Sequence, residues 1–145
     1  MSEQENIEIS KKQVAAFNAR NLDEYLGRID ESYVGESEGP LSPIRGREGV
    51  RKNLEMIFAA FPDVRNEIEQ ILASGDFVVS RAVITGTHKG NFNGIPATNK
   101  PVKLHICSIV ELRNGKAIRG RLYADNATLY QQIGVLSLPK AAAAG

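Results

Sequence analysis

One carboxylate in the second half of the chain has neighbours that could adapt it to proton transfer. Asp125 follows Tyr123 by two positions at the end of an alternating run, so both side chains fall on one face of a predicted strand. The Asn114-Gly115 pair is typical of a two-residue hairpin loop, and its register places Ile106 opposite Tyr123 and Leu104 opposite Asp125. Apolar surroundings raise the pKa of a carboxyl group and suit it to general acid/base catalysis. Asp125 is therefore our candidate catalytic residue, with a helix cap or an ion pair as the structural alternative.

Three arginines on the predicted strands could orient a ligand. Arg119 and Arg121 share the face of Tyr123, and Arg81 alternates with apolar residues on an earlier strand. A guanidinium inside a sheet needs an anion, which is either Asp125 or a carboxylate or enolate on a ligand. We expect a ligand pocket lined by Arg81, Arg121, Tyr123 and Ile106, with Arg119 as a secondary candidate.

The histidines and the cysteine do not indicate a metal centre. His88 and His105 do not have the spacing of a metal-binding helix, and Cys107 lies in an apolar strand where its thiol is expected to pack. The predicted register turns His105 away from Asp125, and only a β-bulge would bring the two together, so His105 is a secondary site candidate. The glycines do not form a nucleotide-binding fingerprint. We expect neither a metal nor a cofactor.

Helices and a sheet have to position these residues. Apolar residues recur at helical spacing over residues 6–19, 22–29 and 48–61, and Pro62 ends the third helix. Alternating and β-branched residues predict strands over 64–72, 77–87 and 102–112, followed by the second strand of the hairpin. Asn126 is the expected cap of a short last helix that ends at Gly134. Helices segregated from a curled antiparallel sheet define an α+β cone with a pocket at its mouth, which the loop at 35–46 could rim.

Composition limits the partners and the location of the chain. Its 145 residues fit one domain, which we place at 1–138, followed by a flexible tail at 139–145. Lys and Arg total 18 against 17 Asp and Glu, which argues against nucleic acid as a partner. The sequence shows neither a secretory leader nor a membrane-spanning run, and its single cysteine agrees with a reducing compartment, so we expect a cytoplasmic protein. Because both sheet faces are apolar, we expect helices to cover one and a second subunit the other, giving a homodimer.

A long segment resembles a known family. The run from Gly86-Thr87-His88 through Gly94-Ile95-Pro96 to Val102 is similar to the Gly-Thr-His-x-Gly-x-Phe-x-Gly-x-Pro segment of the SnoaL-like polyketide cyclases, also known as predicted ester cyclases. Further matches lie at Gly46-Arg47-Glu48-Gly49-Val50, Ala60-Phe61-Pro62-Asp63, Asn114-Gly115-Lys116, Asp125 and Gln131-Gln132-Ile133-Gly134. Together they cover nearly the whole chain.

The resemblance implies a fold and a reaction, and the chain differs from the family pattern at two segments. It implies the nuclear transport factor 2-like, cystatin-like α+β cone, commonly dimeric through the open sheet face. In the family, an aspartate matching Asp125 acts as general acid/base in the aldol ring closure of a polyketide ester, without cofactor or metal. Here Tyr33-Val34-Gly35-Glu36 replaces a segment that often holds histidine, and Arg119-Gly120-Arg121 replaces a Glu-x-Trp segment. These departures favour an anionic or smaller ligand over a flat polyaromatic one.

The expected function is therefore a cofactor-independent enzyme of the cyclase or isomerase type, acting on a small or medium apolar carbonyl ligand. Three alternatives stay open. The same cone also hosts isomerases, dehydratases and epoxide hydrolases, so the fold cannot select the reaction. The chain could instead be a binding module in which Asp125 forms an ion pair with Arg121 or Arg81 and does not catalyse a reaction. It could also be a structural dimerisation module with a filled cone, which predicts that no ligand-sized cavity exists.

Overall fold

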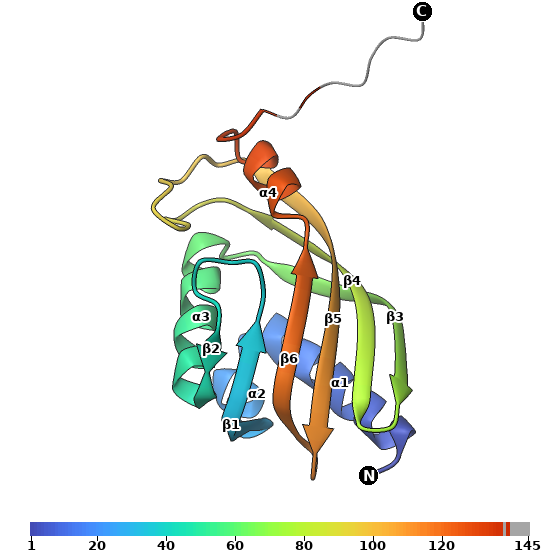
Figure 1. The fold of residues 1–145 in the computed structure, drawn as a ribbon. Coiled ribbons are helices and arrows are strands. Elements are labelled where there is room, and N and C mark those ends of the chain that lie inside the picture. The colour runs from blue at the N-terminus through green and yellow to red at the C-terminus, as the bar shows by residue number, and fades with distance from the viewer. Residues whose placement is uncertain (138, 140–145) are drawn as a thin grey trace, which may run out of the picture.

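The computed structural model describes residues 1–137 and 139 (Figure 1). Three helices, α1 (Glu3–Asn18), α2 (Leu22–Gly27) and α3 (Gly46–Ala60), precede most of the sheet, and α4 (Asn126–Gln132) follows it. The tail expected at 139–145 lies outside the described residues apart from Pro139. No helix in the described part of the chain is long and apolar enough to cross a membrane.

Six strands form one curved sheet in the order β2-β1-β6-β5-β4-β3. The bounds are β1 (Ile29–Glu36), β2 (Ile44–Arg45), β3 (Arg65–Ser74), β4 (Phe77–Thr87), β5 (Pro101–Arg113) and β6 (Lys116–Ala124). Only the β1–β6 pairing is parallel, and the other pairs are antiparallel. The α+β architecture expected from the sequence is confirmed.

Local signals explain where the first helices begin. The Ser2 hydroxyl accepts from Glu5 N and the Glu5 carboxylate accepts from Ser2 N, which is a capping box at the start of α1. Asn21 caps α2 by accepting from Glu24 N, 3.1 Å away. A cap places each helix start within a residue or two, so the amphipathic pattern that follows can pack in one register.

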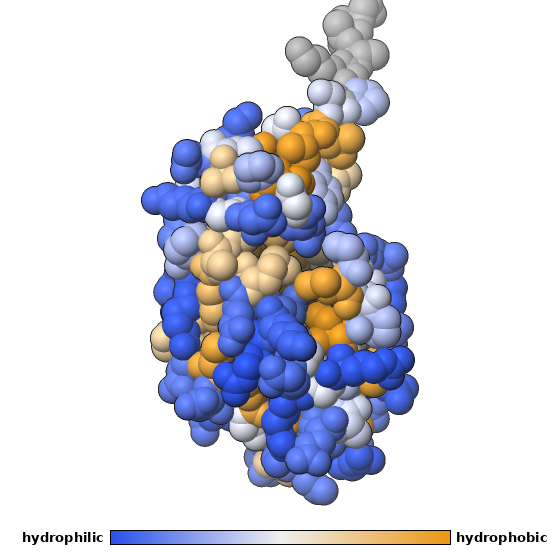
Figure 2. Space-filling model, turned by 90° about the vertical axis from the view of Figure 1, so that its left-hand side faces the viewer, coloured by the Kyte–Doolittle hydropathy of each residue, from blue (hydrophilic) through white to orange (hydrophobic). Residues whose placement is uncertain are grey.

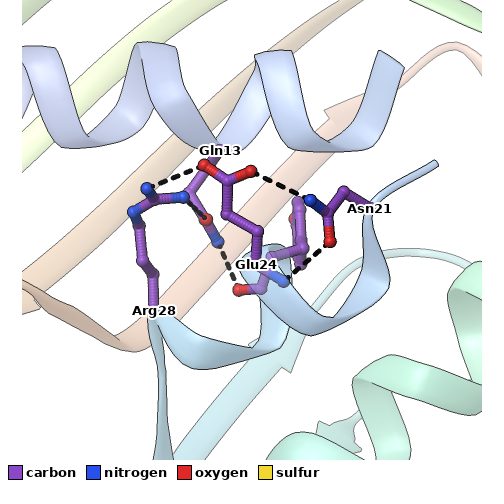
Figure 3. A network of polar contacts seen from close by, with 5 residues as sticks. Gln13, Asn21, Glu24 and Arg28 are labelled. Atoms are coloured by element: carbon purple, nitrogen blue, oxygen red, sulfur yellow. Dashed lines mark hydrogen bonds and ion pairs between the residues drawn. The ribbon is translucent and has the colours of Figure 1, made fainter. Parts of the chain in front are cut away.

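A polar network holds α2 against α1 (Figure 3). The Arg28 guanidinium donates to Gln13 Oε1 at 3.3 Å and to Glu24 Oε1 at 3.0 Å. Gln13 Nε2 in turn donates to the backbone carbonyl of Tyr25, 3.0 Å away. The network therefore fixes the backbone at Tyr25, whose side chain faces the interior.

The core lies between the helices and one face of the sheet, which we call the inner face. Even-numbered residues of β4 and β5 point to it, and two hydrophobic clusters form there. One cluster joins α2, α3 and the turn end of the β5–β6 hairpin, and the other joins the end of α3 to α4. Their buried members include Leu26, Leu54, Val78, Leu112, Phe61, Leu104 and Ile133. The opposite, outer face of the sheet contributes no buried residue to either cluster.

The β5–β6 hairpin begins as expected and then shifts by one residue. Asn114 and Gly115 both have positive φ, and the predicted pairs of Arg113 with Lys116 and Leu112 with Ala117 are confirmed. The next pair is Glu111 with Arg119, which leaves Ile118 as an extra residue in a β-bulge. The predicted pairing of Ile106 with Tyr123 is therefore wrong, because Ile106 pairs with Ala124.

Because of the bulge, the β6 side chains after Ile118 point to the opposite face of the sheet from the one predicted. A shift of one residue turns every later side chain to the other side of the sheet. Arg119, Arg121 and Tyr123 consequently lie on the outer face with Cys107 and Ile109, whereas Gly120, Leu122 and Ala124 face inward. The expected inner face, with Tyr123 and Asp125 beside Ile106, is not formed.

Candidate functional site

The helices and the inner face enclose a cavity of about 450 Å³. Most of its wall is apolar, and the floor comes from alternate residues of the central strands, namely Val78, Ser80, Ala82 and Ile84 of β4 and Leu104, Ile106, Ser108 and Val110 of β5. Residues 37–42 of the loop after β1 also line it, so the expected pocket rim is confirmed for that loop. On the side of the molecule where α3 and β2 lie, hydrophobic residues are exposed between hydrophilic ones (Figure 2). A ligand-sized cavity exists, so the cone is not filled.

Uncharged polar side chains line parts of the cavity. The Ser80 and Ser108 hydroxyl oxygens lie 3.0 Å apart in a cross-strand hydrogen bond. Tyr25 and Tyr33 also line the cavity, and burial raises the pKa of both phenols above the ordinary value, so both are neutral near pH 7. Asn66 contributes a buried side-chain oxygen without a hydrogen-bond partner among the described residues. The interior of the cavity is thus served by neutral hydroxyl and amide groups.

Charged groups meet the cavity only at its rim. The Arg121 guanidinium pairs with Glu36 at 3.3 Å and with Glu38 at 2.5 Å, and its carbon lies 5.4 Å from the centre of the Tyr123 ring. The anions that Arg121 requires are therefore Glu36 and Glu38, and the alternative of an Arg121–Asp125 pair is not formed. Arg121 borders the cavity at this rim, and the two glutamates already compensate its charge.

Asp125 is the N-cap of α4, where Asn126 had been expected. Its Oδ1 accepts from Thr128 N at 3.0 Å and its Oδ2 accepts from the Thr128 hydroxyl at 2.5 Å. The side chain is exposed, and these two hydrogen bonds lower its pKa below the ordinary value. The expected raised pKa is wrong because Asp125 is solvated and hydrogen-bonded rather than desolvated. Its neighbours Ala124 and Asn126 line the cavity.

Asp63 repeats this arrangement elsewhere in the fold. Its carboxylate accepts from Thr87 N at 2.7 Å and from the Thr87 hydroxyl at 2.8 Å, and the Thr87 side-chain hydrogen bond is the main reason that its pKa is lowered. A carboxyl group whose pKa is lowered on folding stabilises the fold at pH values above its unfolded pKa, and this contribution is lost as the pH falls through the folded pKa. We expect the difference in melting temperature between the wild type and Asp63→Asn to shrink below about pH 4. Melting curves between pH 2.5 and 6 check this, and a constant difference would contradict it.

The bulge gathers most of the remaining candidates in a shallow depression on the outer face. His105, Cys107, Tyr123 and Asp125 line it together with Glu38. The β-bulge that could bring His105 to the side of Asp125 is therefore present, although it lies on β6 near the turn. The titratable candidates His105 and Asp125 therefore lie at the depression on the outer face, whereas the space for a ligand lies in the cavity on the inner face.

Two arginine candidates lie away from the cavity. Arg81 occupies the outer face of β4, where it pairs with Glu69 at 3.6 Å and donates to Gln70 at 3.3 Å. Its expected place in the pocket wall is wrong, because residue 81 alternates with the inward-facing Ser80 and Ala82. Arg119 is exposed opposite Glu111 on the outer face. Ile106 does line the cavity, as expected, and also borders the outer depression.

His88 is a packed structural residue. It is fully buried, and its Nδ1 accepts from Thr98 N at 3.3 Å and lies 2.9 Å from the Thr98 hydroxyl. A Cβ on Gly90 would collide with the carbonyl of Ala59, and the amides of Lys89 and Gly90 donate to Ala60 O at the end of α3. The Gly-Thr-His-x-Gly motif thus anchors the loop after β4 to α3. Among the described residues no group of three or more His, Cys, Asp or Glu could hold a metal ion.

Comparison with known proteins identifies the family. The family model for SnoaL-like polyketide cyclase matches residues 8–133, and the chain belongs to this family. Its fold is that of the nuclear transport factor 2-like group to which these cyclases belong, as the resemblance implied. No curated protein matches the chain significantly.

Solved structures support the same assignment. AclR, a candidate hydroxylase from Streptomyces galilaeus, has 27% identity and a TM-score of 0.84, with 96% of this chain and 87% of that chain covered. IdmH, a candidate polyketide cyclase from Streptomyces antibioticus, has 28% identity and a TM-score of 0.79, with coverages of 90% and 99%. An M. tuberculosis LEH-like epoxide hydrolase has 18% identity, a TM-score of 0.73 and coverages of 90% and 90%, which shows a shared fold alone. Proteins of this fold therefore bear names from different reaction classes.

Proposed function

We propose that the chain is a cofactor-independent enzyme of the cyclase or isomerase type that acts on a small or medium apolar carbonyl compound, such as a polyketide-like ester. The observation that carries the proposal is the cavity of about 450 Å³, which is enclosed by apolar walls and supplied with a few neutral hydroxyl groups. Such a cavity suits a ligand whose carbon skeleton is buried and whose few oxygens are hydrogen-bonded. Family membership supports ring closure as the reaction.

Asp125 is the proposed proton acceptor, placed where β6 meets α4. Ala124 and Asn126 on either side of it line the cavity, so a ligand that extends past α4 could reach the carboxylate. Asp125 is ionised near neutral pH, which is the form that a base requires, and its lowered pKa makes it a weaker base than the raised pKa expected from the sequence would. The carboxylate removes a proton from the carbon next to a carbonyl, and the enolate carbon then bonds to a second carbonyl carbon. The resulting alkoxide recovers the proton from Asp125, which restores the enzyme.

A binding protein without turnover is the second candidate. Thr128 already donates one hydrogen bond to each oxygen of Asp125. In this case the cavity binds the same class of compound, and Asp125 serves only to begin α4. Turnover of a bound compound distinguishes the two candidates.

A ligand screen tests the proposed function. Wild type and Asp125→Asn are screened by thermal shift against polyketide esters, steroids, terpenoid epoxides and small aromatic acids, and turnover is assayed on every hit. A compound that wild type converts and Asp125→Asn only binds supports the enzyme. Hits that bind both proteins equally without conversion favour the binding protein. The absence of any hit would contradict both.

We also propose that a second copy covers the outer face, forming a homodimer of single-domain subunits. Leu72 and Phe77 are each 46% exposed and Tyr123 is 51% exposed there, which is a large apolar surface to leave in water. Phe77→Arg is expected to convert the dimer to a monomer, as measured by sedimentation velocity, because a guanidinium would replace apolar surface that the second copy buries. Gln4→Arg on α1 adds the same charge at an exposed position and should remain dimeric. A monomeric wild type would contradict the proposal.

The free thiol of Cys107 agrees with the cytoplasmic location that we propose.

A further inference from the structure

The hydroxyl of Tyr33 occupies a notch in the inner face. Gly35 on β1 and Gly120 on β6 are register partners, and both line the cavity beside Tyr33. A Cβ on Gly35 would lie 2.8 Å from Tyr33 Oη, and a Cβ on Gly120 would lie 2.5 Å from it. Both distances are shorter than Cβ atoms tolerate, so the pair of glycines makes the room in which this hydroxyl sits.

Tyr33 Oη has no hydrogen-bond partner within residues 1–137 and 139, although most of the side chain is buried. The hydroxyl faces the cavity, so it can donate to an acceptor that comes within reach there. Burial also raises its pKa, so the group is a neutral O–H donor throughout the physiological range. The hydroxyl is therefore available to a ligand.

Several other polar groups of the cavity are engaged within the protein. Ser80 and Ser108 bond to each other, and Gln13 is held between Tyr25 O and Arg28 (Figure 3). Arg121 at the rim is bound by two glutamates. Tyr25 is a second phenol in the cavity wall, and the Tyr33 hydroxyl differs from it by lying in the notch between Gly35 and Gly120.

We infer that Tyr33 donates a hydrogen bond to a neutral carbonyl oxygen of the ligand and that the Gly35–Gly120 notch sets the position of this donor. The inference rests on the proposed function, since it requires a ligand in the cavity. A single neutral donor does not compensate a buried carboxylate, so the ligand class is a ketone or an ester rather than an acid. The same hydrogen bond would strengthen as the carbonyl oxygen gains charge in an enolate.

The test compares two probes of nearly equal size that differ in one carbonyl group, 9-fluorenone and fluorene. Dissociation constants of both are measured for wild type, Tyr33→Phe, Gly120→Ala, Gly27→Ala and Ser80→Ala. The ratio of the two constants in each protein cancels general effects on the cavity. The infrared carbonyl stretch of bound fluorenone reports the hydrogen bond directly. Gly27→Ala is the matched control for Gly120→Ala, because a Cβ at Gly27 meets no atom within 4 Å.

We expect Tyr33→Phe and Gly120→Ala to lower the preference of the protein for the ketone by about three- to tenfold, the range typical of one hydrogen bond. Both variants should also shift the carbonyl stretch toward its value in an apolar solvent, and Gly27→Ala should behave as wild type. If wild type binds both probes and Tyr33→Phe changes neither the preference nor the stretch, the inference is overturned while the proposed function stands. Loss of the preference in Ser80→Ala with no loss in Tyr33→Phe would overturn it in favour of the serine pair. If wild type binds neither probe, the inference and the carbonyl ligand of the proposed function both fail.

Discussion

Asp125→Asn is expected to lower kcat/KM for a converted ligand by about 10²- to 10⁴-fold while the dissociation constant changes little. The amide can no longer accept a proton, although its oxygen can still accept from Thr128 N and preserve the cap of α4. Steady-state kinetics and calorimetric binding of the same compound measure the two effects separately. Activity should stay nearly constant from about pH 5 to 8, because the lowered pKa keeps Asp125 ionised over this whole range.

Asp63→Asn provides a matched control for this prediction. Asp63 also accepts hydrogen bonds from the backbone amide and hydroxyl of a threonine, and the substitution removes the same charge. Asp63 does not line the cavity, so the activity of the Asp63→Asn variant should equal that of wild type. Equal losses in both variants would show that stability, not proton transfer, is affected. A fall in wild-type activity between pH 6 and 7.5 would contradict Asp125 as the group that sets the pH dependence.

Ser108→Phe should abolish or greatly weaken ligand binding, with a dissociation constant raised at least about tenfold. Ser108 lies on the floor of the cavity, and a phenyl ring there occupies volume that the ligand needs. The melting temperature should not fall much, because the ring fills empty space next to apolar walls and removes a hydroxyl that bonds only to Ser80. Calorimetry with any compound found to bind the wild type checks this effect.

Ile109→Phe is the control for cavity filling. Ile109 is the next residue along β5 and points to the outer face, so the same ring is added to the same strand without entering the cavity. Its affinity for the ligand should match that of wild type. Binding that survives in Ser108→Phe, or that is lost equally in both variants, would place the ligand somewhere other than the cavity.

Much of the fold follows from local signals. The hairpin at Asn114-Gly115 depends on two residues that accept positive φ, and the start of α2 depends on an asparagine that caps it. Helical spacing over 48–61 and the proline that follows predict α3 almost to its ends. These features involve residues that are neighbours in the chain, so their energies can be judged without knowing the tertiary structure.

The bulge at Ile118 shows where such reasoning stops. No residue type in the Lys116–Ala124 strand requires an extra residue there, and either register places apolar groups on both faces. The choice is made by packing, because the bulged register points Gly120 toward Tyr33 and turns two arginines away from the core. This one extra residue in the strand was enough to place Arg121 and Tyr123 on the outer face of the sheet instead of the inner face.

Motifs and periodicity along the chain were enough to predict the family, the α+β class, the order of most elements and the presence of a rim loop. Three-dimensional packing was needed to show that Asp125 begins α4 in solvent, that Arg121 is held by Glu36 and Glu38, and that Tyr33 sits over two glycines. Each of the last two arrangements joins segments far apart in the chain, and the solvent exposure of Asp125 likewise depends on how those segments pack. A pKa or a hydrogen-bond partner depends on what surrounds a group in three dimensions, which spacing along the chain does not specify.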